Sequence, residues 1–334
     1  MGNRNSPIGI FDSGVGGLTV AHALHSLLPH EQMIYYGDTL HLPYGDKSRE
    51  TIVSYSLGIS DFLLKQDCKV ILIACNSASS NAWEEVREHV GDRALVMNVI
   101  DPVVEELCSE AEGPGSGSDP GFGPVGEGPG SVGEGPGSVG EGPGSVGVIG
   151  TKATIDSESY PRRIRERCPG LQVSSLATPL FVPMIEEGFV FDDISNAIIR
   201  AYLSRRELEG IDTLILGCTH YPIIRNQISR FFDFRVNVLD TAQIVARRLH
   251  ELLRDNDLLS DPGPGADSGP GADFGPGADF GPGADFGPGA DSGPGAGSRP
   301  HRFLVSDHTP YFGVIASMFF TEKIHLEKVN IWSR

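Results

Sequence analysis

The stretch KVILIACNS, at residues 69–77, indicates the fold most clearly, because a second stretch, DTLILGCTH at residues 212–220, has the same pattern. In both, an apolar run of strand length ends in a cysteine, and amide, hydroxyl or imidazole side chains follow it. Downstream, NVID at residues 98–101 has its counterpart in NVLD at residues 237–240. The chain therefore repeats its own plan, which predicts two halves of the same architecture.

Short β-branched runs alternate with amphipathic stretches along both halves, which is the βαβ pattern of a parallel sheet. Strands are predicted at residues 8–11, 33–36, 70–74, 95–99, 147–149, 173–177, 213–216, 236–239 and 303–305. Helices are predicted at residues 18–28, 49–65, 79–90, 102–112, 192–206 and 241–253. We expect an α/β protein of two pseudo-symmetric, flavodoxin-like parallel-sheet domains with the active site in the cleft between them. The first domain would comprise residues 1–98 and 241–334, and the second residues 99–240.

Two low-complexity segments interrupt this frame. VGEGPGS occurs three times in succession between residues 125 and 145, and Asp-x-Gly-Pro-Gly-Ala occurs six times between residues 261 and 296. Gly and Pro dominate both, so each would lose much conformational entropy on ordering and bury almost nothing in return. We expect disordered inserts at residues 113–145 and 261–298, and the sequence assigns them no role.

The formal net charge of −18 says little about partners. The two inserts hold four and six acidic residues and no Lys or Arg, so more than half of the net charge lies in them. The remainder has no basic patch of the kind that nucleic-acid binding requires. Its longest apolar runs are strand-sized, and no signal-peptide stretch precedes the first strand. We therefore expect a cytoplasmic protein that binds neither nucleic acid nor a membrane.

The chain has five cysteines, Cys68, Cys75, Cys108, Cys168 and Cys218. An odd number without tight spacing argues against a disulfide framework and suits a reducing compartment. No CxxC or HExxH motif is present, so no metal site is expected. Cys68, Cys108 and Cys168 are interpreted as small buried hydrophobic residues.

Cys75 and Cys218 differ from the other three because each ends a strand and precedes a helix. Ligands gather at the carboxyl ends of strands in open α/β sheets. Free backbone N–H groups and the helix dipole stabilise a thiolate there, so we expect each pKa to fall from about 8.5 towards neutrality. Two such thiols facing one cleft can invert a carbon acid: one thiolate removes the α-proton and the other thiol protonates the opposite face. A cysteine hydrolase would instead need a His base and an oxyanion hole.

Four segments, taken together and in order, resemble glutamate racemases of the aspartate/glutamate racemase superfamily. They are FDSGVGGLT at residues 11–19, GDT at 37–39 with PYG at 43–45, ACNSAS at 74–79, and GCTHYP at 217–222. The likeness runs from about Ile8 to Leu253 without the first insert, and continues weakly after Arg302. It implies interconversion of L- and D-glutamate without a cofactor, which would supply D-glutamate for peptidoglycan.

The same resemblance implies roles for individual residues. Cys75 would deprotonate D-glutamate and Cys218 would deprotonate L-glutamate. Substrate contacts would fall on Asp12, Ser13, Tyr44, Gly45, Asn76, Ser77, Thr219 and His220, with auxiliary roles for Glu186, Thr151 and Thr154. The family commonly has Thr where this chain has Ser77, which keeps the hydroxyl and loses the methyl group.

Simpler roles stay open for three of these residues. Asp12 can cap the following helix, His220 can be a satisfied structural histidine, and Glu186 can be a solvated surface charge. An aspartate or hydantoin racemase also stays open, because side-chain length is sensed by a pocket shape that the sequence does not display.

Three other functional classes fit the sequence less well. A pyridoxal-phosphate racemase would need a Schiff-base lysine, and Lys152 lies in a suitable turn without a phosphate cup around it. The glycine turn has Thr19 where a dinucleotide fingerprint requires Gly or Ala, and is better interpreted as room for a carboxylate. A non-catalytic binding or regulatory protein on the same frame remains an alternative, although both cysteines are retained. The sequence also leaves open a homodimer.

Overall fold

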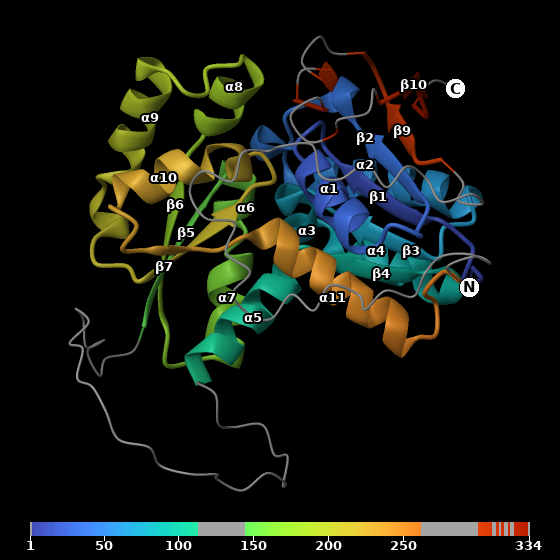
Figure 1. The fold of residues 1–334 in the computed structure, drawn as a ribbon, viewed down its shortest axis with the longest axis horizontal. Coiled ribbons are helices and arrows are strands. Elements are labelled where there is room, and N and C mark those ends of the chain that lie inside the picture. The colour runs from blue at the N-terminus through green and yellow to red at the C-terminus, as the bar shows by residue number, and fades with distance from the viewer. Residues whose placement is uncertain are drawn as a thin grey trace, which may run out of the picture.

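The computed structural model describes residues 2–112, 144–261, 300–308, 312–313, 315–316, 320 and 324–332. The inserts expected at residues 113–145 and 261–298 lie almost wholly outside these residues. Within the described residues, two parallel β-sheets, of six and four strands, are flanked by helices (Figure 1). This confirms the predicted α/β class, whereas the domain boundaries stay a prediction. No helix in this part of the chain has the length and apolar character needed to span a membrane.

The six-stranded sheet has the order β10-β9-β2-β1-β3-β4, and all its strand pairs are parallel. Its strands are β1 (Ile8–Asp12), β2 (Met33–Gly37), β3 (Val70–Ile73), β4 (Leu95–Asn98), β9 (Arg302–Val305) and β10 (Leu326–Lys328). The helices beside it are α1 (Leu18–Leu27), α2 (Arg49–Lys65), α3 (Asn76–Asn81), α4 (Trp83–Val90) and α11 (Thr241–Asp255). Strands β1, β2 and β3 are buried along their whole length, because helices cover both faces of a parallel sheet.

The four-stranded sheet has the order β6-β5-β7-β8 and is also parallel. Its strands are β5 (Ser145–Gly150), β6 (Gln172–Ala177), β7 (Thr213–Gly217) and β8 (Asn237–Val238). The remaining helices are α5 (Ile100–Glu112), α6 (Lys152–Asp156), α7 (Ser159–Arg167), α8 (Phe181–Glu186), α9 (Asp193–Leu203) and α10 (Arg225–Phe231). Short 3-10 helices are η1 (Thr39–His41), η2 (Tyr44–Asp46), η3 (Gly91–Arg93), η4 (Arg206–Leu208) and η5 (Tyr221–Ile224).

Two helices connect the halves. Helix α5 leaves the larger sheet after β4, and α11 follows β8 and packs on α1 and α5 (Figure 1). All nine predicted strands are found, but the helix predicted at residues 79–90 is divided at Ala82 into α3 and α4. Helices α6, α7, α8 and α10 were not predicted, because helices of five to nine residues are too short for their period to stand out.

The structure corrects the interpretation of two cysteines. Cys108 in α5 and Cys168 at the end of α7 form a disulfide, with their Cα atoms 5.7 Å apart. The disulfide joins two helices that pack against each other. It could not be predicted from the sequence, because the two cysteines are 60 residues apart. Cys68, Cys75 and Cys218 are free and buried.

A buried ion pair lies at the amino ends of β2 and β3 in the larger sheet. Lys69 Nζ lies 2.5 Å from Glu31 Oε2, and both side chains are almost fully buried. The ammonium also donates to the carbonyl oxygens of Arg4 and Leu258, at 2.6 and 2.8 Å. Three acceptors from distant parts of the chain therefore converge on one buried ammonium.

Candidate active site

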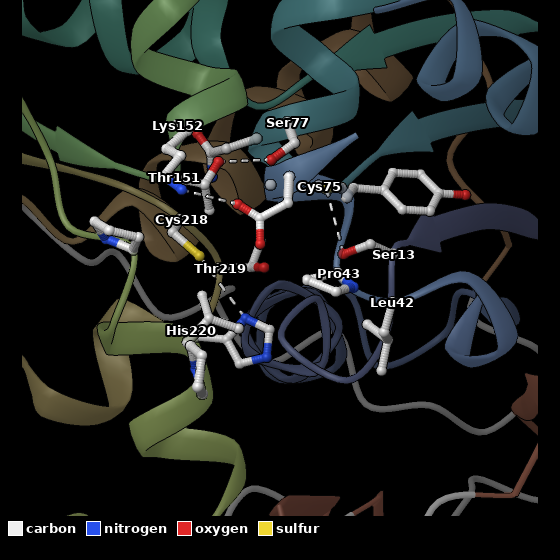
Figure 2. A pocket seen from close by; sticks show the side chains of 17 residues that line it. Ser13, Leu42, Pro43, Cys75, Ser77, Thr151, Lys152, Cys218, Thr219 and His220 are labelled. Atoms are coloured by element: carbon white, nitrogen blue, oxygen red, sulfur yellow. Dashed lines mark hydrogen bonds and ion pairs between the residues drawn. The ribbon is translucent and has the colours of Figure 1, made fainter. Parts of the chain in front are cut away.

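Cys75 and Cys218 line one cavity, which lies between the two sheets' carboxyl ends (Figure 2). Cys75 follows β3 and occupies the N-cap position of α3, and Cys218 follows β7 just before η5. Their exposed fractions are 4% and 6%. The cavity has a volume of about 50 Å³. Two thiols from equivalent strand ends in the two halves therefore reach the same pocket.

Most of the residues predicted for the site also line this cavity. They are Ser13, Tyr44, Gly45, Cys75, Asn76, Ser77, Thr151, Cys218, Thr219 and His220. Asp12, Thr154 and Glu186 are not on the lining, but each bonds to a residue that is. Thr219 donates to Asp12 at 3.2 Å, the Thr151 and Thr154 hydroxyls are 3.1 Å apart, and Glu186 Oε1 lies 3.0 Å from His220 Nε2.

Cys75 is held as a thiol. Burial, and secondarily the negative charge of Asp12, raise its pKa to about 12. Opposing contributions come from the N–H groups of Ala78 and Ser13 and from the Ser13 hydroxyl, 3.6 Å from the sulfur. The expected fall towards neutrality was therefore wrong for Cys75, because the desolvation of a buried thiolate outweighs the N–H groups at the helix start.

Cys218 has a different environment. Its sulfur lies 3.8 Å from His220 Nδ1 (Figure 2), and His220 Nε2 lies 3.0 Å from Glu186 Oε1 on the other side of the ring. Burial alone would lower the pKa of His220, but Cys218 and Glu186 together raise it well above its ordinary value. An imidazolium at this position stabilises negative charge on the Cys218 sulfur. Glu186 is thus fixed against His220 rather than being a solvated surface charge.

Asp12 lies beneath the cavity and is fully buried. Its carboxylate accepts from Gly14 N at 2.8 Å, in the turn before α1, and from Thr219. Burial raises its pKa, and the positive charge of His220 opposes this. The N-cap residue of α1 is Gly17, so Asp12 binds the turn before the helix rather than capping it in the usual position. Its predicted contact with a substrate ammonium stays a prediction.

The glycine turn brings the two halves close together. A Cβ atom on Gly16 would lie 2.4 Å from Thr219 Oγ1 and 2.5 Å from His220 Nδ1, so only glycine fits there. Thr219 and His220 of the second half fill the space at this glycine, whereas the sequence suggested that a substrate carboxylate would fill it.

Hydrogen bonds from α3 to α6 and α7 form one wall of the site. The hydroxyls of Ser77 and Thr151 are 2.9 Å apart (Figure 2). The buried Tyr160 hydroxyl donates to Asn76 Oδ1 at 2.8 Å, so the amide nitrogen of Asn76 is turned away from Tyr160. Hydroxyl and amide groups of this kind bind carboxylates without a full positive charge.

Sequence reasoning missed two charged residues and an apolar wall. Lys152 Nζ and Asp46 Oδ1 face each other at 3.6 Å from α6 and η2, and both residues line the cavity. The sequence placed Lys152 in a suitable turn but gave it no role in this site, and Asp46 was marked only by its adjacency to Gly45. The apolar part of the lining comprises Leu42, Pro43, Pro179, Val182 and Pro183. In the part of the chain that the structure describes, no cluster of three or more His, Cys, Asp or Glu side chains is placed to hold a metal ion.

The chain is similar in sequence to glutamate racemases of several bacteria. The chain is 38% identical to the glutamate racemase of Geobacter metallireducens over 252 residues, which covers 75% of this chain and 82% of that protein. It is 36% identical to the glutamate racemase of Aquifex pyrophilus, with coverage of 75% and 84%. The chain belongs to the glutamate racemase family of isomerases. No protein-family model matches the chain.

Solved glutamate racemases have the same fold. The structure of the Francisella tularensis glutamate racemase in complex with D-glutamate is 32% identical, with a TM-score of 0.74 and coverage of 99% of this chain and 100% of that chain. A glutamate racemase isoform from Bacillus anthracis gives a TM-score of 0.73 at 26% identity, with coverage of 98% of both chains. The family resemblance inferred from the four motifs is therefore confirmed.

Proposed function

We propose that this glutamate racemase interconverts L- and D-glutamate with Cys75 and Cys218 as its acid–base pair and with no cofactor. The single observation that carries the proposal is that both thiols line one cavity from equivalent strand ends in the two halves. Opposite faces of one α-carbon can then be reached by two different sulfur atoms, which racemisation through a carbanion requires.

In the L-to-D direction, the Cys218 thiolate takes the α-proton and becomes a thiol. The Cys75 thiol, which burial keeps protonated, gives its proton to the opposite face of the α-carbon and becomes a thiolate. The D-to-L direction runs through the same steps in reverse. His220 and Glu186 stabilise the charge at Cys218, and no equivalent imidazole is hydrogen-bonded to Cys75 among the described residues.

The polar lining supplies the substrate contacts in this proposal. The hydroxyls of Ser13, Ser77 and Thr219 and the amide of Asn76 would bind the carboxylates, with backbone N–H groups at Tyr44 and Gly45. Asp12 would attract the α-ammonium through its charge, and Thr151 and Thr154 would hold Ser77 in place.

We propose that the enzyme prefers glutamate to aspartate as its substrate. Support comes from the Francisella tularensis relative, which was solved with D-glutamate. We also propose that the product supplies D-glutamate for peptidoglycan in a bacterial cytoplasm, and that the protein functions as a homodimer.

The direct test follows the circular dichroism of L- and D-glutamate, and of L- and D-aspartate, with purified protein and no added cofactor. Loss of optical activity for both glutamate enantiomers, at a rate well above that for aspartate, is expected. Faster racemisation of aspartate would reassign the substrate, and no change with either amino acid would favour the non-catalytic alternative.

A further inference from the structure

A buried carboxylate, Asp38, connects the cavity to the segment after β10. The Asp38 side chain is fully buried between β2 and η1. It accepts hydrogen bonds from the Tyr44 hydroxyl at 2.7 Å, from Trp332 Nε1 at 2.9 Å and from His41 Nδ1 at 2.9 Å. Two donors from the segment just after Asp38 and one from the distant Trp332 thus share one carboxylate, and one of them, Tyr44, lines the cavity.

Trp332 occupies a shaped site rather than a loose surface position. Its ring centroid lies 5.0 Å from that of His41 and 5.3 Å from that of Tyr55. A Cβ atom on Gly58 would lie 2.8 Å from the indole, so α2 leaves room for the ring only because residue 58 is glycine. Packing and a charge-assisted hydrogen bond therefore fix the same side chain.

The hydrogen bond to Asp38 fixes the position of Tyr44 on the cavity lining. Burial and the neighbouring charge of Asp38 raise the pKa of Tyr44 well above its ordinary range, so the hydroxyl stays a neutral donor. Because that hydroxyl is bonded to Asp38, η2 is held by its first residue, and Tyr44, Gly45 and Asp46 all line the cavity. A shift of Asp38 would move the turn that closes one side of the site.

We propose that Trp332 and Asp38 are positioning residues for the Tyr44–Asp46 turn, so that the segment after β10 sets the affinity of the site for its dicarboxylate substrate. This inference rests on the proposed racemase function. Neither residue touches the reacting atoms: Trp332 orients Asp38, Asp38 holds Tyr44, and the turn presents its backbone N–H groups to a carboxylate.

Trp332→Phe is the test variant, because it keeps an aromatic ring and removes the N–H donor. We expect the KM for L- and D-glutamate to rise roughly threefold to tenfold, less than the full value of one charge-assisted hydrogen bond because Trp332 acts on the site only through Asp38, with kcat changed less than twofold. Trp83→Phe is the matched control: it removes the chain's other tryptophan, which lies at the start of α4 near Arg87, and it should leave KM unchanged.

A second variant keeps the inference falsifiable if Trp332→Phe folds poorly. Tyr44→Phe removes the hydrogen bond between the Tyr44 hydroxyl and Asp38. The double variant should raise KM by less than the product of the two single effects, because both changes act through Asp38. A Trp332→Phe protein with wild-type KM, or effects that multiply, would overturn the inference. If wild type itself does not racemise glutamate, the proposed function fails instead, which is a distinguishable result.

Discussion

His220 Nδ1 lies 3.8 Å from Cys218 Sγ, and this relationship makes the two halves of the site chemically unequal. The imidazole is backed by Glu186 at 3.0 Å and lies in a buried position. Cys75 instead has the Ser13 hydroxyl beside its sulfur and the negative charge of Asp12 nearby. This inequality supports the proposal that Cys218 starts as the base and Cys75 as the acid in the L-to-D direction.

The first prediction concerns His220→Asn. Removing the imidazole should slow proton transfer at Cys218, and kcat/KM should fall roughly 10²-fold, the usual scale of assisted proton transfer. The fall should be equal in both directions, because L- and D-glutamate are enantiomers with an equilibrium constant of unity.

The asymmetry should instead show in isotope effects. With His220→Asn, the primary isotope effect should grow for L-glutamate deuterated at Cα, because Cys218 removes that deuterium in the slow step. It should shrink for deuterated D-glutamate, for which Cys75 removes the deuterium. Equal changes for both enantiomers would contradict the assignment of His220 to Cys218.

The second prediction concerns the pH dependence of Cys75. Since its pKa is raised to about 12, the thiolate fraction should increase about tenfold for each pH unit between neutrality and that value. Alkylation of Cys75 by iodoacetamide, measured by peptide mass spectrometry on the Cys218→Ser variant, should follow this slope. A rate that reaches a plateau near neutral pH would show that the thiol is activated in the free enzyme.

The third prediction concerns Tyr160→Phe. The hydroxyl holds Asn76 Oδ1 across the two halves, so its loss should let the amide rotate and raise the KM for glutamate roughly threefold to tenfold. Steady-state kinetics should be compared with Tyr202→Phe, a buried tyrosine that packs on Phe181 and is not on the cavity lining. Equal effects of the two changes would assign Tyr160 a packing role alone.

The fourth prediction concerns stability. Lys69→Met should leave the Glu31 carboxylate buried without its partner, which costs about 3–5 kcal/mol of the free energy of unfolding. Urea denaturation measures this cost, and Lys65→Met, at the exposed end of α2, is the matched control. A loss as small as that of the control would mean that the pair contributes no net stability.

The strand ends could be predicted from the sequence, because their signals are local. An apolar run that ends in Cys75 or Cys218 gives both the strand and its carboxyl end, and the four motifs gave the family. The acid–base pair could be inferred from the two strand-end cysteines, whereas the roles of the other site residues were accessible by resemblance, and all of these roles stay predictions.

Contacts between distant residues could not be predicted. Nothing in the sequence pairs Cys108 with Cys168, or places Trp332 on Asp38, because these contacts depend on how helices and strands pack. The pKa of Cys75 was misjudged for a related reason. The sequence displays the helix start that stabilises a thiolate, but it does not display the burial that opposes it.

The central claim is that two thiols act on one α-carbon, and the most direct measurement follows racemisation by the variants Cys75→Ser and Cys218→Ser. Circular dichroism of L- and D-glutamate should show no racemisation by either variant in either direction, while calorimetry still detects glutamate binding, because each direction needs both sulfur atoms. Racemisation at a rate near that of wild type, by either variant, would contradict the account.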